Sequence, residues 1–361
     1  MARDQDISAT RAAVWKISVD KCSGRAKMDQ TKNGRSNFRS TFKKHQVLIF
    51  KAVTWGVAIF CFYLAYSKIL ASAESREISV LEFVTSFFAN VDWIYWLLIM
   101  VPYSIFFFVV DTHAAWRAIK WFNTPELTYR NIMPIRASAL ILSIVSEQVG
   151  KGAMSLYLLR RYKVPGWEAI STMVVLGICE IYQLLIFSSL GVLFYYEFLL
   201  EADWNFPVIK ILISIFGLAA LYVPIHFFIF NRARKKSSGF FSNPVFASLR
   251  KAEVYHYLLL LFFKAPNLLG AVLVYSLALS LFGFEVPYSK MLMFLPLIFL
   301  AAALPLPFHA GALVIWMLCF PEFPEVSIFS LIMHTFFLSM NAFIGVCFLP
   351  YANKELFAGK K

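Results

Sequence analysis

Six long apolar segments constrain the fold of this 361-residue chain more than any other feature. A membrane-spanning α-helix needs about 20 consecutive apolar residues, and each of these segments is long enough. Inside lipid the backbone polar groups must be satisfied within the segment itself, which favours helices. The expected spans are approximately 46–68, 91–111, 167–196, 207–230, 254–281 and 327–350. We therefore predict an all-α polytopic membrane protein, in agreement with a hydrophobic content of 60%.

Two further apolar regions are interrupted near their middles. A polar stretch at Glu147–Gly152 interrupts the region 137–159, and a proline-rich stretch at Leu304–Gly311 interrupts the region 288–320. Irregular backbone at membrane depth is tolerated only where protein or a water-filled cavity surrounds it. We expect both regions to form broken, re-entrant hairpins. The residues expected to break or kink helices are Gly150, Gly152, Pro266, Pro305, Pro307 and Gly311.

The distribution of charge between the spans predicts the topology. The N-terminal 45 residues, the segments 112–136, 152–168 and 231–253, and the tail from Tyr351 together hold 27 of the 34 Lys and Arg residues. The other connections are rich in Asp and Glu. Cytoplasmic segments carry an excess of Lys and Arg, so we expect both termini on the cytoplasmic side of the membrane.

The same rule predicts the side from which each broken hairpin enters. The flanks of the region 137–159 are basic, whereas those of the region 288–320 are acidic. We therefore expect the two hairpins to enter from opposite sides, as in an inverted-topology repeat. Internal sequence identity between the two halves is not visible, so the repeat is a hypothesis. The alternative is that one or both regions cross the membrane completely.

The chain divides into a basic arm at 1–45, a transmembrane domain at 46–350 and a short cytoplasmic tail at 351–361. The arm holds 11 Lys and Arg residues against four Asp residues and has little apolar periodicity. We expect it to be disordered and to lie against anionic lipid, with a docking site for a partner enzyme as the alternative. Because the basic residues lie between apolar spans, the net charge of +13 indicates a membrane surface rather than nucleic acid.

Polar side chains at membrane depth are the candidates for function, because a charge there is costly unless it is paired or hydrated. Glu180 and Gln183 share one helix face near the middle of the third span, and Lys264 lies near the middle of the fifth. Such groups from several separate segments indicate a hydrated groove. The candidate groove residues are Glu147, Lys151, Glu180, Gln183, Lys264, Asn267, His309 and His334.

Each candidate also has a purely structural interpretation. A buried ion pair would account for Lys264 with Glu180, and ordinary packing would account for each histidine alone. Glu147 and Lys151 lie four residues apart in the order that favours an ion pair within one helix. The sequence contains no phosphate-binding loop, zinc-protease motif or nucleophile elbow. We therefore expect no catalytic residue, no metal and no cofactor.

Several short motifs point to a known family. They are Val149-Gly-Lys151, Leu156-Tyr-Leu-Leu-Arg-Arg161 before the linker to Gly166, and the second break Leu304-Pro-Leu-Pro-Phe-His-Ala-Gly-Ala312. Over about residues 46–350 the chain resembles the lysylphosphatidylglycerol synthase transmembrane family, a flippase-like domain. The resemblance implies an inner-membrane domain with re-entrant helices that moves or binds an aminoacylated phospholipid or a lipid-linked glycan. Lys151 stands where the family usually has an acidic residue, and the aminoacyl-transferase domain is absent, which implies a divergent stand-alone member.

These features predict a lipid translocase rather than an enzyme. It would be a flippase- or scramblase-like protein whose partners are membrane lipids, either a phospholipid or a lipid-linked glycan, with a lipid-modifying enzyme or glycosyltransferase as a further partner. The alternative is a membrane subunit or enzyme of glycolipid or phospholipid modification, with Glu147 or His309 as the acid or base. A third interpretation is a scaffold that recruits partners through its basic arm.

Overall fold

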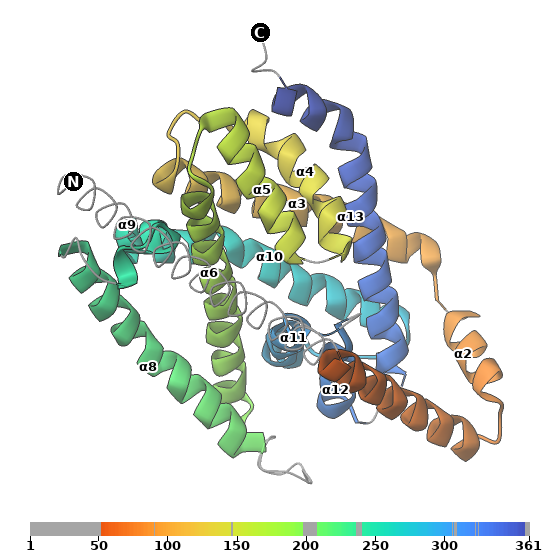
Figure 1. Cartoon of the computed structure of the whole chain (residues 1–361). Coiled ribbons are helices and arrows are strands. Elements are labelled where there is room, and N and C mark those ends of the chain that lie inside the picture. Colours follow the sequence, from red (N-terminus) through yellow and green to blue (C-terminus); the bar gives the residue numbers. More distant parts are fainter. Residues whose placement is uncertain are drawn as a thin grey trace, which may run out of the picture. The chain divides into compact units, whose positions relative to one another are not determined.

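The structure is a computed structural model that describes residues 52–89, 91–145, 147–197, 208–235, 240–304, 306, 309–321, 323 and 325–357. Every regular element among these residues is a helix, which confirms the predicted all-α fold (Figure 1). The chain divides into two units, Met1–Phe60 and Cys61–Lys361, and the packing below is that of the second. The predicted arm at 1–45 lies outside the described residues, as do Pro305 and Pro307.

Six helices are long and apolar enough to cross a membrane, which confirms the six predicted spans. They are Ala52–Ser75, α3 (Trp93–Phe122), α6 (Gly166–Phe194), α8 (Val208–Lys235, apolar over Ile213–Arg232), α10 (Val254–Leu281) and α13 (Val326–Phe357). The protein is therefore a multi-pass membrane protein. The predicted second span stops at Asp111, where a charge interrupts the apolar run. In the structure α3 continues to Phe122, because its last turns are buried by neighbouring helices. The shorter elements are α2 (Val80–Ala89), η1 (Phe240–Ser242), η2 (Pro244–Phe246) and α9 (Ala247–Lys251).

The two interrupted regions form helical hairpins, as predicted. The first consists of α4 (Tyr129–Val145) and α5 (Glu147–Tyr162), and the second of α11 (Tyr288–Ala302) and α12 (Ala310–Cys319). At 1.5 Å per residue, none of these helices is longer than about 25 Å, which is less than the roughly 30 Å hydrocarbon layer. In the second hairpin the start of α11 contacts the end of α12, because the Lys290 ammonium lies 5.5 Å from the centroid of the Phe320 ring.

Among the described residues, the expected helix-breaking residues lie inside helices. The first interruption falls between Val145 and Glu147, so Gly150 and Gly152 lie inside α5. A Cβ at Gly150 would lie 2.9 Å from the Ala139 carbonyl of α4, and one at Gly311 would lie 2.9 Å from the Ala301 carbonyl of α11. These two glycines therefore permit close helix approach within their hairpins. Pro266 lies inside α10, which continues through it.

The order of the helices repeats. α3 begins at Trp93 and α10 at Val254, 161 residues later, and the starts of α4 and α11, of α5 and α12, and of α6 and α13 differ by 159, 163 and 160 residues. The packing repeats with the helices exchanged: α3 packs on α10, α4 packs on α13, and α11 packs on α6. α3–α6 and α10–α13 are thus two structural repeats. The last helix of each repeat packs on the hairpin of the other repeat, α6 on α11 and α13 on α4.

Two hydrophobic cores show that the second repeat is inverted relative to the first. One core contains Trp96 from the start of α3 and Leu279 from the end of α10, together with α11 and α12. The other contains Phe122 from the end of α3 and Tyr257 from the start of α10, together with α4 and α5. α3 and α10 are therefore antiparallel, and the two hairpins occupy opposite halves of the transmembrane domain, as the charge pattern predicted.

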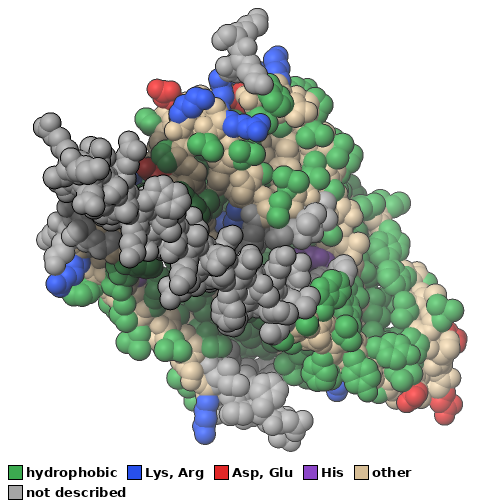
Figure 2. Space-filling model, viewed as in Figure 1, with side chains coloured by type: hydrophobic (Ala, Val, Ile, Leu, Met, Phe, Trp, Pro, Cys, Tyr) green, Lys and Arg blue, Asp and Glu red, His purple; other side chains and the backbone are tan. Residues whose placement is uncertain are grey.

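Charged side chains distinguish the two ends, which we call the acidic end and the basic end. Beside the first core lie Glu74, Glu77, Glu82, Asp92 and Glu285. Beside the second core lie Lys120, Arg160, Arg161, Arg250 and Lys251. Figure 2 shows Lys and Arg side chains gathered at the top of the view and Asp and Glu side chains at the lower right. The cores are named accordingly the acidic-end core and the basic-end core.

The packing of each hairpin on a long helix of the other repeat, which we call the exchange of hairpins, depends on two glycines. A Cβ at Gly191 of α6 would collide with the Met293 Cα of α11, and one at Gly345 of α13 would lie 2.7 Å from the Ala137 carbonyl of α4. We expect Gly191→Ala to lower the free energy of unfolding by about 1–3 kcal/mol, because the two helices must separate. Thermal unfolding of the purified protein in detergent measures this change.

Gly217 of α8 provides the matched control, since a Cβ there would meet nothing within 4 Å. We expect Gly217→Ala to change stability by less than about 1 kcal/mol, in the direction of greater helix propensity. Equal stability of Gly191→Ala and wild type would contradict the close packing of α6 on α11.

Candidate functional site

Charged side chains from five helices meet between the two hydrophobic cores. They are Asp111 of α3, Arg136 of α4, Lys151 of α5, Glu180 of α6 and Lys264 of α10, and we call them the ionic centre. α3, α6 and α10 each pass from one core to the other, and Asp111, Glu180 and Lys264 lie between the parts of these helices that belong to the two cores. The ionic centre is therefore about halfway along the transmembrane helices.

Four of the five side chains form a continuous network of ion pairs. Arg136 donates from Nε and Nη2 to Asp111 Oδ2 at 2.9 and 2.7 Å. Lys264 Nζ lies 3.5 Å from Asp111 Oδ1 and donates to Glu180 Oε1 at 3.0 Å. Asp111 thus bridges two cations, and Lys264 bridges two carboxylates. The network joins helices of both repeats, because α10 belongs to the second.

Burial separates the members of the ionic centre. Lys264 is 5% exposed and Asp111 8% exposed, so their charges depend on each other for compensation. The Glu180 side chain is 41% exposed. A cavity of about 20 Å³ lies between these residues, enough for roughly one water molecule. Its lining carries three cations and two carboxylates.

The structure brings together three of the eight predicted groove residues, Lys151, Glu180 and Lys264. The ion pair between Lys264 and Glu180, expected as a structural alternative, is present. The Lys151 ammonium lies beside Gly177 of α6, since a Cβ at Gly177 would lie 3.8 Å from Lys151 Nζ. The side chain of Glu147 lies outside the described residues, so its predicted pairing with Lys151 stays a prediction.

Asn267 and Gln183 lie one turn from the ionic centre on α10 and α6. Asn267 donates from Nδ2 to the Phe107 carbonyl at 3.3 Å, and its backbone carbonyl accepts from the Tyr103 hydroxyl at 3.0 Å. Asn267 therefore holds α10 against α3. Gln183 is buried, and its Nε2 has no hydrogen-bond partner among the described residues.

Asp111 and Arg136 were not among the residues predicted for the groove. Asp111 stands at the predicted end of the second span, and Arg136 was counted as part of a basic flank. Both are drawn into the interior because α3 and α4 extend beyond the predicted boundaries. The sequence signal was the apolar pattern after Asp111, where Ala115, Ala118 and Ile119 continue a buried helix face.

His309 and His334 form a second polar site, apart from the ionic centre. His309 Nδ1 lies 3.0 Å from His334 Nε2, and the ring centroids are 4.1 Å apart. The pair joins the start of α12 to α13, beside the acidic-end core. His309 has a φ of 51°, in the left-handed region that favours glycine.

Because of this backbone conformation, two substitutions of His309 are expected to differ in stability. His309→Ala and His309→Gly both remove the hydrogen bond to His334, but only glycine adopts a positive φ at little cost. We expect His309→Gly to be more stable than His309→Ala by about 1–2 kcal/mol, measured by thermal unfolding in detergent. Equal stability of the two variants would show that residue 309 does not keep the left-handed conformation.

Among the described residues, no group of three His, Cys, Asp or Glu side chains could hold a metal ion. The chemistry that the ionic centre offers is electrostatic, namely a partly hydrated place for a charged group at the middle of a membrane domain. No protein family, no curated protein and no solved structure matches this chain.

Proposed function

We propose that this membrane protein moves an anionic lipid with a phosphate-bearing head group between the two leaflets, and that the head group passes through the ionic centre. The observation that carries the proposal is that three cations from both repeats line one cavity halfway along the helices. Charged groups at membrane depth are costly, and they mark the paths of charged cargo in membrane proteins. Arg136, Lys151 and Lys264 provide donors for phosphate oxygens, and Glu180 accepts from head-group hydroxyls or an amine.

The cavity in this structure is too small for a head group. A head group can therefore enter only if the α4–α5 hairpin, which carries Arg136 and Lys151, moves away from α6 and α10. Inverted repeats are suited to such motion, because the two halves can rock about a site at their interface. The ionic centre draws its residues from both repeats, which supports this mode of access.

Two further parts of the proposal rest on the sequence. The basic end is assigned to the cytoplasmic side of a bacterial-type inner membrane by its excess of Lys and Arg. The resemblance of the breaks and their flanks to the lysylphosphatidylglycerol synthase transmembrane family supports a phospholipid or a lipid-linked glycan as the cargo. Both cargoes carry phosphate next to their hydrocarbon tails, so both suit the same centre.

Reconstitution into vesicles tests the proposal. The full chain is incorporated into phosphatidylcholine vesicles with a trace of lipid labelled on the acyl chain, so that the head group is unmodified. A membrane-impermeant reductant then bleaches label in the outer leaflet. We expect labelled anionic phospholipid to become fully accessible faster than labelled phosphatidylcholine.

Protein-free vesicles give the background rate, and circular dichroism shows that the reconstituted protein is helical. A lipid-linked glycan with a similar label tests the second cargo class. If neither class crosses faster in the presence of folded protein than in its absence, the protein is not a translocase for phosphate-bearing lipids.

A further inference from the structure

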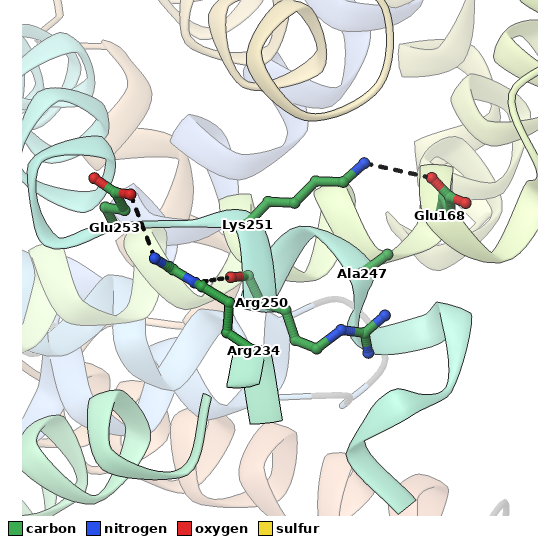
Figure 3. Close-up of a pocket in the computed structure, with 6 residues that line it drawn as sticks. All are labelled: Glu168, Arg234, Ala247, Arg250, Lys251 and Glu253. Carbon is green, nitrogen blue, oxygen red and sulfur yellow. Dashed lines mark hydrogen bonds and ion pairs between the residues drawn. The ribbon is translucent and has the colours of Figure 1, made fainter. Parts of the chain in front are cut away.

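A second charged cavity lies at the basic end, separate from the ionic centre (Figure 3). It has a volume of about 480 Å³ and lies where α6 and α10 begin and where α8 and α9 end. We call it the basic-end pocket. Its lining residues are Glu168, Arg234, Ala247, Arg250, Lys251 and Glu253.

The charges in the basic-end pocket are only partly compensated. Arg234 Nη1 lies 3.3 Å from Glu253 Oε1, and Lys251 Nζ lies 3.7 Å from Glu168 Oε2. Arg250 instead donates to the backbone carbonyls of Phe241 and Asn243, which are neutral. No carboxylate in the described part of the chain pairs with Arg250, so the pocket keeps one uncompensated positive charge.

The pocket is held in shape by the same cations. Arg234 donates to the carbonyls of Arg250 and Ala252 at 2.8 and 3.1 Å, which ties α8 to the end of α9. Lys251 donates to the Phe122 carbonyl at 3.1 Å, which ties α9 to the end of α3. These bonds position the groups before any ligand binds, which reduces the ordering that binding requires.

Exposed aromatic residues indicate that the pocket lies at the level of the lipid head groups. Trp167 precedes Glu168 and is 61% exposed, Tyr255 lies two residues after Glu253 and is 51% exposed, and Phe240 of η1 is 75% exposed. Trp and Tyr gather where the hydrocarbon of a membrane meets water. A cavity with an unpaired guanidinium at this level faces phosphates of the adjacent leaflet.

We propose that the basic-end pocket binds the phosphate of an anionic phospholipid from the adjacent leaflet, with Arg250 as the principal contact. The planar guanidinium suits two phosphate oxygens, and Glu168 and Glu253 accept from head-group hydroxyls at the sides. The site is distinct from the ionic centre and does not depend on transport. A resident lipid here would join the ends of α3 and α8 to the starts of α6 and α10.

Thermal unfolding of the full chain in detergent tests the site. Added phosphatidylglycerol is expected to raise the unfolding temperature of the wild type, and phosphatidylcholine to raise it much less. In Arg250→Gln the apparent affinity for phosphatidylglycerol is expected to fall about tenfold, the effect of losing a charged hydrogen-bond partner. Arg250→Lys keeps the charge and is expected to lie between Arg250→Gln and the wild type.

Arg160→Gln is the matched control, since Arg160 is an exposed cation of the same end that does not line the pocket. It is expected to respond to phosphatidylglycerol as the wild type does. The readout is the shift caused by lipid, so a lower starting stability of Arg250→Gln does not affect the conclusion. Equal shifts in Arg250→Gln and wild type would remove Arg250 from the site.

Two further outcomes would overturn the assignment of the ligand. Equal stabilisation by phosphatidylglycerol and phosphatidylcholine would show that the pocket does not select an anion. Equal stabilisation by glycerol phosphate, which has the same phosphate without acyl chains, would show that the ligand is a soluble anion. None of these outcomes bears on the transport assay, so failure of this site and failure of the proposed function can be told apart.

Discussion

Asp111→Asn is expected to lower the free energy of unfolding by about 3–5 kcal/mol, the largest stability change proposed for any single residue here. The carboxylate accepts two hydrogen bonds from Arg136 and lies 3.5 Å from Lys264 Nζ, in a position only 8% exposed. The amide keeps the shape of the side chain but leaves two cations near the middle of the membrane domain without this partner. Thermal unfolding in detergent measures the loss.

Asp92→Asn provides a control with the same substitution on the same helix. Asp92 caps the start of α3 by accepting from the Ile94 and Tyr95 amides, and Asn caps helices equally well. We expect little change in stability for this variant. Removal of a cation together with Asp111, as in Asp111→Asn with Arg136→Met, is expected to restore part of the loss. Additive destabilisation by those two changes would show that Asp111 and Arg136 do not depend on each other.

Lys151→Glu is expected to slow the movement of anionic phospholipid at least tenfold, because it replaces one of the three cations that line the cavity with a carboxylate. Lys151 is partly exposed, so the effect on stability is expected to be smaller than that of Asp111→Asn. The vesicle assay with acyl-labelled lipid measures the rate. Lys151→Arg preserves the charge and is expected to keep most of the transport.

Arg160→Glu is the control on the same helix, because Arg160 lies at the exposed basic end of α5 rather than at the ionic centre. It introduces the same change of charge about 14 Å further along the helix. Wild-type transport by a folded Lys151→Glu variant would exclude the ionic centre as the route of the head group. A loss of equal size in Arg160→Glu would place the electrostatic effect at the membrane surface instead.

The uneven distribution of charge between the repeats has a functional implication. The backbone repeats closely, with helix starts about 160 residues apart, but the ionic centre includes Arg136 and Lys151 of the first hairpin and no residue of α11 or α12. The break of the second hairpin instead carries His309, which is hydrogen-bonded to His334 of α13. Under the proposed transport, the two hairpins would therefore offer different chemistry to a head group.

Several properties follow from the sequence alone, because they depend on local composition. The six spans, the two interrupted regions and the polar residues near the span centres are visible as apolar runs and their exceptions. The opposite entry of the hairpins also follows, since the charge of their flanks is local. Lys151, Glu180 and Lys264 could be chosen for this reason, because a charge within an apolar run is costly wherever the run is packed.

Only the tertiary structure decided which of these charges meet. Asp111 and Lys264 are 153 residues apart in the chain, and no local pattern shows that antiparallel packing of α3 on α10 brings them together. The same holds for Gly191 and Gly345, whose importance depends on the backbone of a helix in the other repeat. The sequence by itself determined the membrane-spanning helices and their breaks. The pairing of the ionic centre and the exchange of hairpins were decided by the tertiary structure, because they depend on contacts between distant segments.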